Sequence, residues 1–214
     1  MNKFLRVSIV AALAISATTP AFALSINPLV SDSNTGTNLA NAWLGASSGI
    51  TVVGPVSYIG DNSQAGTYTG FALNSSTSTS PNVTFGDGIL LTSGNANIPD
   101  TNTEDDFGAV TSTGSSTTIS TITGLPTNDA NSLSFSFTVG SGITSISSNF
   151  IFGSDEFPEF ADGFEFVIDG INYAKFSDGT NVSLATLSSN ANLLDNTAGI
   201  YGIEYDGFTL AWAL

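Results

Sequence analysis

Hydrophobic and polar residues alternate in short segments along most of the chain. In residues 133–139, Leu, Phe and Val are separated by Ser and Thr, the period of two that indicates a strand with one buried face. Short apolar segments between Gly, Pro and Asn residues are also typical of strands. They are residues 50–53, 56–59, 67–73, 88–92 and 146–152. We therefore expect a chain rich in β-structure.

Two Asp-Gly dipeptides predict tight hairpins. The first, at residues 169–170, has the composition of a type I′ turn and would place Ile168 opposite Ile171. The second, at residues 206–207, would join the strands on either side of it in the same way. Hairpins of this kind connect antiparallel strands, so the sheets are expected to be antiparallel.

One short helix is predicted near the N-terminus. Thr37 can cap it, Leu39, Ala42 and Trp43 follow at helical spacing, and Gly45 ends it. Many short strands with frequent turns and one minor helix favour the all-β class. The architecture that fits best is an antiparallel β-sandwich, jelly-roll-like.

The long segment of residues 93–131 is dominated by Asn, Asp, Ser and Thr and has few apolar residues to bury. It is predicted to be loop or exposed edge strand. It does not have the character of a linker between domains, and residues 24–214 are therefore expected to form a single domain.

The first 23 residues have the three parts of a secretory signal peptide. Lys3 and Arg6 precede an apolar segment at residues 7–15, and Ala21-Phe22-Ala23 has the small-x-small pattern of a cleavage site. A membrane anchor is the alternative, but the apolar segment is well short of the roughly 20 residues that span a bilayer. Cleavage after Ala23 would leave no transmembrane segment in an exported, extracellular or cell-surface chain.

Composition excludes several classes of function. The 214 residues include 18 acidic and 3 basic side chains, a net charge of −15, and neither His nor Cys. Cys/His zinc sites, disulfides and Ser-His-Asp or Cys-His catalysis are thus excluded. A chain this acidic repels phosphate backbones, so nucleic acid is excluded as a partner. After cleavage, Lys175 would be the only basic residue, and the charge would be −17.

Five carboxylates lie within eleven residues, in a loop that follows a predicted strand: Asp155, Glu156, Glu159, Asp162 and Glu165. Carboxylates this close repel one another, and a hard cation with oxygen ligands, such as Ca²⁺, would relieve the repulsion. Asp155, Glu156 and Glu159 are the first expected ligands because Pro158 turns the chain between them, and Asp162 comes next. Glu165 could instead be a solvent-facing strand residue. The alternative is a solvated acidic loop without a fixed ion.

Three other motifs are weaker. The acids and amides of residues 100–106 begin like an EF-hand, but Asp105 stands where Gly is needed, so only a loose loop site remains possible. Gly45-Ala-Ser47-Ser-Gly49 matches a nucleophile elbow, but it follows a helix instead of preceding one and the chain has no His. The carboxylates of residues 155–165 could serve a glycoside hydrolase. However, a sugar site usually has aromatic platforms, and Trp43 and Trp212 are both expected in the core.

The run Phe150-Ile-Phe-Gly-Ser-Asp-Glu-Phe-Pro-Glu-Phe160 and the aromatic strand from Phe164 to Lys175 resemble the choice-of-anchor L domain family. Weaker similarities extend the resemblance to about residues 37–209. The resemblance implies an exported bacterial surface protein, related to those with a PEP-CTERM anchor and without established enzymatic activity. Members continue into further strands and an anchor where this chain stops at Leu214, so we expect either a truncated C-terminus or an unanchored variant.

Together these features predict a non-enzymatic surface or extracellular-matrix module with an adhesive or structural role, which calcium could stabilise. Its partners would be surface polysaccharide or other matrix proteins. No organic cofactor is expected. The alternative function is a secreted carbohydrate-binding module or a glycoside hydrolase that uses the 155–165 carboxylates.

Overall fold

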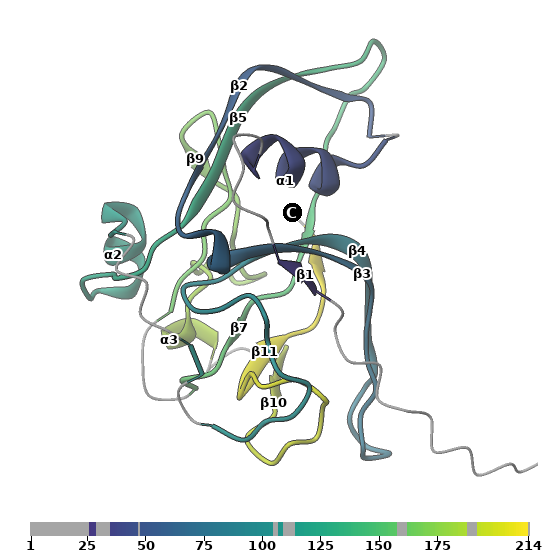
Figure 1. Ribbon diagram of the computed structural model, residues 1–214, viewed down its shortest axis with the longest axis vertical. Helices are drawn as coiled ribbons and strands as arrows, with labels where there is room; N and C mark the ends of the chain where they lie inside the picture. Colours follow the sequence, from purple (N-terminus) through teal and green to yellow (C-terminus); the bar gives the residue numbers. More distant parts are fainter. Residues whose placement is uncertain are drawn as a thin grey trace, which may run out of the picture.

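Antiparallel strands make up most of the regular structure in the computed structural model (Figure 1). The structure describes residues 26–28, 35–46, 48–104, 107–108, 114–157, 162–187 and 192–213. The predicted leader, residues 1–23, lies outside these ranges, and its cleavage stays a prediction. The predicted all-β, antiparallel class is confirmed, with the described strands in small sheets of two or three strands.

Two long ladders dominate residues 26–139 of the chain. β2 (Ile50–Ile59) pairs with β5 (Ser132–Val139), and β3 (Ala65–Leu73) pairs with β4 (Val83–Leu91), while β1 (Ile26–Pro28) adds to β3. The predicted strands at 50–53 and 56–59 are therefore one strand. An irregularity in pairing separates its halves at Gly54-Pro55, because Gly54 has a φ of 73° and Pro55 has no N–H to donate.

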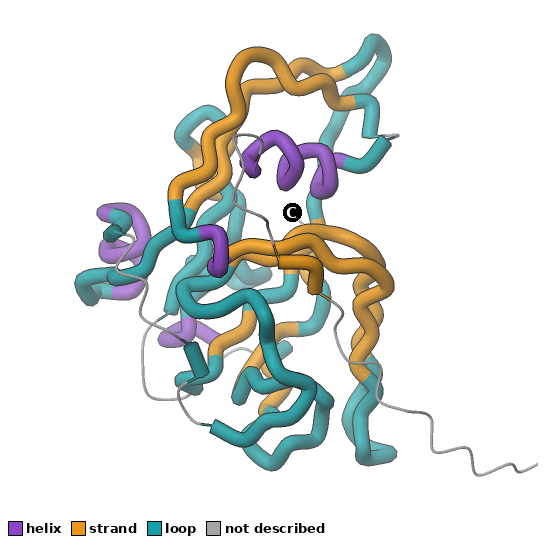
Figure 2. The backbone as a smooth tube through the Cα atoms, viewed as in Figure 1, coloured by secondary structure: helices purple, strands orange, loops and turns teal. Residues whose placement is uncertain are grey.

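The second half of the chain contains shorter strands (Figure 2). β11 (Gly207–Thr209) lies between β10 (Leu193–Asp195) and β7 (Gly153–Ser154). Two pairs complete the set: β6 (Asn149–Phe150) with β12 (Trp212–Ala213), and β8 (Val167–Ile168) with β9 (Ile171–Asn172).

The hairpin at residues 169–170 is confirmed. Asp169 and Gly170 have φ values of 50° and 80°, as a type I′ turn requires, and Ile168 faces Ile171. The hydrogen bonding continues to the next pair, since the Tyr173 N–H donates to the Phe166 carbonyl oxygen at 2.8 Å. It ends before Phe164, whose N–H donates to the Val182 carbonyl oxygen at 3.1 Å.

Two other strand predictions are wrong. Only Asn149–Phe150 within segment 146–152 is a strand, and Ile146 is exposed. The hairpin predicted at residues 206–207 does not form. Gly207 is instead the first residue of β11 and pairs with Ser154 of β7, a strand that is distant in sequence. A local turn signal is overridden here by long-range pairing.

The predicted helix near the N-terminus is present as α1 (Thr35–Leu44). It begins before Thr37, so Thr37 lies inside the helix and does not cap it, contrary to the prediction. Gly45, with a φ of 65°, ends it as expected. Leu39 is buried, whereas Ala42 is exposed.

The expectation of a single helix is wrong, because η1 (Asn62–Gln64), α2 (Thr117–Thr123) and α3 (Leu184–Leu187) are also helical. α2 lies in the Ser/Thr-rich segment predicted as loop or edge strand. Ser116 caps it by accepting a hydrogen bond from the Ile119 N–H at 3.2 Å, and Gly124 ends it with a φ of 75°. Cap residues thus define a helix whose composition hides it.

The buried side chains form two clusters. The first packs β3 and β4 against the 196–208 segment through residues such as Phe71, Tyr201 and Phe208. The second packs residues 174–187 against Phe150 and Phe152. The acidic segment that follows β7 begins beside the second cluster, against which Phe157 packs. Tyr205, which precedes β11, packs against the first cluster.

Candidate functional site

Two aspartates face one another at the end of the β7–β11 ladder. Asp155 directly follows β7 and Asp206 directly precedes β11. Because Gly207 pairs with Ser154 in this antiparallel ladder, Asp206 and Asp155 take the next facing positions. Both are buried, with 6% and 5% of their surface exposed, respectively. Two carboxylates are therefore brought together from segments about 50 residues apart in sequence.

A third buried carboxylate lies one residue before Tyr205. Glu204 is fully buried, and its Oε1 accepts hydrogen bonds from the backbone N–H groups of Thr103 at 3.0 Å and Glu104 at 2.6 Å. The Glu204 N–H donates to the Pro99 carbonyl oxygen at 3.2 Å. Loop 99–104 is therefore fixed to this end of β11 through the backbone.

The same loop also contacts the two aspartates. The Asn102 Nδ2 donates to Asp206 Oδ1 at 2.8 Å, and the Phe107 N–H donates to Asp155 Oδ2. Hydrogen bonds from N–H groups favour the charged form of a carboxylate. Loop 99–107 thus supplies donors to three buried acids, which with Asp162 we call the acidic pole: Asp155, Asp162, Glu204 and Asp206.

The Ser154 side chain connects Asp162 to the residues that follow β7. Its hydroxyl donates to Asp162 Oδ2 at 2.7 Å and accepts from the Glu156 N–H at 3.2 Å. Burial raises the pKa of Asp162, and the Ser154 hydrogen bond opposes this shift. One hydroxyl therefore holds both ends of the 155–162 loop.

The negative charges of the pole affect the pKa of Tyr205. Burial raises the pKa of its phenol to about 12; a hydrogen bond with the Thr92 side chain opposes this, and the charges of Asp162 and Asp155 add to the increase. The phenol is consequently neutral at physiological pH and lies close to both carboxylates.

Positive charge is scarce around these acids. Lys175 is the only basic residue after position 23, and its Nζ donates to Asn181 Oδ1. The pole thus balances its charges with N–H and O–H donors in place of basic side chains, an arrangement in which an added cation would be electrostatically favourable.

The structure brings together part of the predicted ligand set. Asp155 and Asp162 both belong to the pole, Glu156 is half-buried beside them, and Glu159 lies outside the described residues. In the part of the chain that is described, no three acidic side chains come close enough to form a metal site by themselves. Carboxylate and carbonyl oxygens are the ligands that suit Ca²⁺, so Asp155, Glu156 and Asp162 are of the chemical type that a calcium site needs. Glu159 and backbone carbonyl oxygens of the loop would have to supply the remaining ligands.

Glu165 does not project freely into solvent, the possibility considered for it. It is partly buried, its Oε2 is buried without a hydrogen-bond partner among the described residues, and burial raises its pKa. No hydrogen bond of the described residues joins it to the acidic pole.

Sequence reasoning missed Glu204 and Asp206 because the Asp206-Gly207 dipeptide was interpreted as a hairpin turn. A signal was available, since two acids flank Tyr205 within an otherwise largely apolar segment. The 100–106 loop was considered as a separate weak cation site, whereas its Asn102 amide and backbone N–H groups bind the acids of the pole.

The features that suggested catalysis lie partly outside the described residues. Ser47 of the nucleophile-elbow match lies outside the described residues. Trp43 packs edge-on against Phe135 and Phe166, with ring centroids 5.9 and 5.5 Å away, so it is a packing residue as expected. The side chain of Trp212 is not among those described.

Comparison with known proteins identifies a family. The model of the choice-of-anchor L domain matches residues 25–209, while no curated protein and no solved structure matches the chain. Within the described residues, no helix has the length and apolar character needed to cross a bilayer. Since the match spans the acidic pole and both hydrophobic clusters, the chain belongs to the choice-of-anchor L domain family.

Proposed function

We propose that this protein is a non-enzymatic, exported surface module with an adhesive or structural role, and that Ca²⁺ stabilises its acidic pole. The observation that carries the proposal is the burial of Asp155, Glu204 and Asp206 under the N–H donors of loop 99–107. Acids bound in this way fix a loop, whereas a hydrolase needs carboxylates open to substrate.

The surface role rests on family membership and on the predicted signal peptide. Export would place the module where surface polysaccharide and other matrix proteins are available as partners. N-terminal sequencing of exported protein is expected to start at Leu24, and retention of residues 1–20 would contradict the proposal.

Calcium would act by neutralising the pole. Asp155 and Asp162, with Glu156 and Glu159, are the residues that would hold the ion. An extracellular site needs only weak affinity, roughly 10⁻⁴ to 10⁻³ M. At a hundredfold excess over Kd, binding to the folded state alone adds about 2.7 kcal/mol to the free energy of unfolding.

Thermal melting in chelator, in Ca²⁺ and in Mg²⁺ tests this part of the proposal. A specific site raises Tm more with Ca²⁺ than with Mg²⁺, and Asp155→Asn removes the difference while keeping an acceptor for the Phe107 N–H. Asp87→Asn is the matched control, because it removes one exposed charge on β4 and its amide oxygen can still accept from the Gly70 N–H. Equal stabilisation by both ions would indicate screening alone.

The alternative is a glycoside hydrolase that uses the same loop, for which Glu156 and Glu159 are the candidate acids. Hydrolysis of polysaccharides at a rate above background, lost in Glu156→Gln or Glu159→Gln, would replace the non-enzymatic assignment.

A further inference from the structure

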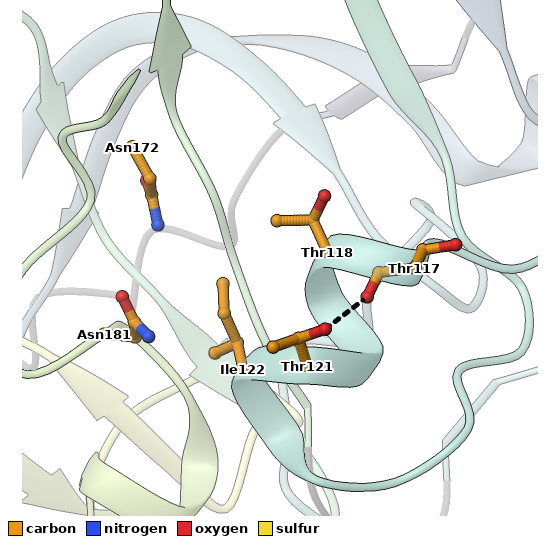
Figure 3. A pocket seen from close by; sticks show the side chains of 6 residues that line it. All are labelled: Thr117, Thr118, Thr121, Ile122, Asn172 and Asn181. Carbon is orange, nitrogen blue, oxygen red and sulfur yellow. Dashed lines mark hydrogen bonds between the residues drawn. The ribbon is translucent and has the colours of Figure 1, made fainter. Parts of the chain in front are cut away.

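A pocket of about 330 Å³ lies between helix α2 and the segment that follows the β8–β9 turn (Figure 3). This volume is at the lower end of the roughly 300 to 1,000 Å³ typical of ligand sites. Its lining comes from α2 on one side and from two asparagines on the other: Thr117, Thr118, Thr121, Ile122, Asn172 and Asn181. None of the lining residues is charged, so the pocket is distinct from the acidic pole.

The Asn172 side chain has a defined orientation. Its Oδ1 accepts hydrogen bonds from the backbone N–H groups of Phe166 at 3.1 Å and Ala174 at 2.9 Å. An amide turned the other way would oppose N–H to N–H, so the carbonyl end must face these two donors. The Nδ2 group is consequently left as a donor.

The Asn172 Nδ2 is buried and has no hydrogen-bond partner in the described part of the chain. Figure 3 shows this nitrogen turned toward the space between the hairpin and α2. A buried donor without an acceptor costs about 1–3 kcal/mol, and such an atom in the lining of a pocket favours a ligand that brings an acceptor oxygen.

Asn181 repeats this arrangement. Its Oδ1 accepts from the Lys175 Nζ, which leaves its Nδ2 as a second donor. In Figure 3 this nitrogen is directed toward Ile122, across the pocket. Two amide donors therefore line one wall.

The opposite wall presents methyl groups. The Thr121 hydroxyl donates to the Thr117 carbonyl oxygen at 2.9 Å, which turns its methyl group toward the side of Ile122 in Figure 3. In Figure 3 the Thr118 methyl group is turned toward Asn172, and the Thr118 hydroxyl points away from the two asparagines. The pocket thus combines two amide donors with a wall of methyl groups, which takes the place of the aromatic platform usual in a sugar site.

We propose that this pocket binds an N-acetylated sugar of a surface polysaccharide. The acetamido carbonyl oxygen would accept from Asn172 Nδ2, the acetyl methyl group would pack on Ile122, and a ring hydroxyl would accept from Asn181 Nδ2. An acidic polysaccharide is disfavoured because the chain carries a net charge of −15. The proposal gives the adhesive role a ligand but is independent of calcium.

Titration of the ¹⁵N-labelled full chain with triacetylchitotriose, followed by NMR, tests the proposal. Cellotriose is the matched control ligand, because it has a hydroxyl in place of each acetamido group. We expect the Asn172 side-chain NH₂ signals to shift, and affinity for triacetylchitotriose to exceed that for cellotriose by about tenfold, the equivalent of one hydrogen bond to a buried donor. Equal affinities, or no shift at millimolar ligand, would overturn it.

Asn172→Asp removes the donor and keeps an acceptor for the Phe166 and Ala174 N–H groups. It is expected to abolish the preference for the acetylated ligand, whereas Asn97→Asp, an exposed change of the same charge, should retain it. Ile122→Ala, which leaves both donors in place, should weaken triacetylchitotriose binding more than cellotriose binding. A retained preference in Asn172→Asp would overturn the assignment.

Two further ligands separate the remaining explanations. Tighter binding of trigalacturonate than of triacetylchitotriose would overturn the assignment of a neutral sugar as the ligand. If N-methylacetamide shifts the same signals with equal affinity, the pocket recognises an amide group alone and the assignment of a sugar ligand is overturned. Loss of calcium stabilisation with sugar binding intact would refute only the calcium proposal.

Discussion

Removal of the Asn196 side chain should release the segment that carries part of the first hydrophobic cluster. Asn196 is fully buried, its Nδ2 donates to the carbonyl oxygens of Ile203 and Tyr205, both at 2.9 Å, and its Oδ1 accepts from the Tyr201 N–H at 2.7 Å. One amide thus satisfies three backbone groups of an irregular segment. Tyr201 and Ile203 are cluster members, so the backbone network and the core depend on each other.

The expected loss of stability can be worked out from these hydrogen bonds. Asn196→Ala leaves three buried backbone groups without their partner, at about 1–3 kcal/mol each, and the sum is reduced wherever water enters the cavity. We expect a loss of roughly 3 kcal/mol in the free energy of unfolding, a large part of the roughly 5–15 kcal/mol typical of a domain. At roughly 2–4 °C per kcal/mol for a domain of this size, Tm should fall by about 6–12 °C.

Urea unfolding followed by circular dichroism, together with a thermal melt, measures the change. Asn97→Ala is the control, since this loop asparagine is exposed and should lie within about 0.5 kcal/mol of the parent. If Asn196→Ala is as stable as Asn97→Ala, the amide does not hold the segment, and the reasoning from buried hydrogen bonds is refuted.

Two further predictions concern pH and packing. Burial raises the pKa of Asp162 and Glu165 above the ordinary 3.8 and 4.5, so the folded state keeps these protons to higher pH than the unfolded chain, and the resulting stability is lost as pH rises through the folded-state values. In calcium-free buffer, these two groups add stability as the pH falls toward their ordinary pKa values, so the Asp162→Asn/Glu165→Gln variant should lose this contribution to Tm at acidic pH; identical pH profiles would contradict the assignment. A Cβ added at Gly207 would lie 2.8 Å from the Phe157 ring, so Gly207→Ala should cost about 1–3 kcal/mol in urea unfolding. Gly140→Ala, whose nearest contact is 3.4 Å, should cost clearly less, and equal losses would show that the close approach is not the cause.

Much of the fold could be predicted where local chemistry decides the outcome. The alternation in residues 133–139 became β5, the Asp169-Gly170 dipeptide adopted positive φ values in a tight turn, and Gly45 ended α1. In each case the signal and its consequence lie within a few residues. Acid content and the lack of His and Cys likewise exclude whole classes of chemistry, because the side chains that those reactions need are missing from the chain.

The candidate sites depended on contacts between distant segments. Asp155 appeared as part of a local cluster, but its facing residue, Asp206, is about 50 positions away, and the loop that binds both comes from residues 99–107. Periodicity and turn chemistry carry no information about such pairs. The same reason explains why the Asp206-Gly207 dipeptide was mistaken for a hairpin.

By itself the sequence determined the antiparallel β-rich class, the family resemblance, the predicted leader and a strongly acidic chain, because these depend on composition, periodicity and short motifs. The tertiary structure alone decided which strands pair, which acids are buried, and that Asn172 and α2 form a pocket. Burial and hydrogen bonding depend on how far segments approach in space, and the free energy that selects those approaches comes from packing the whole chain.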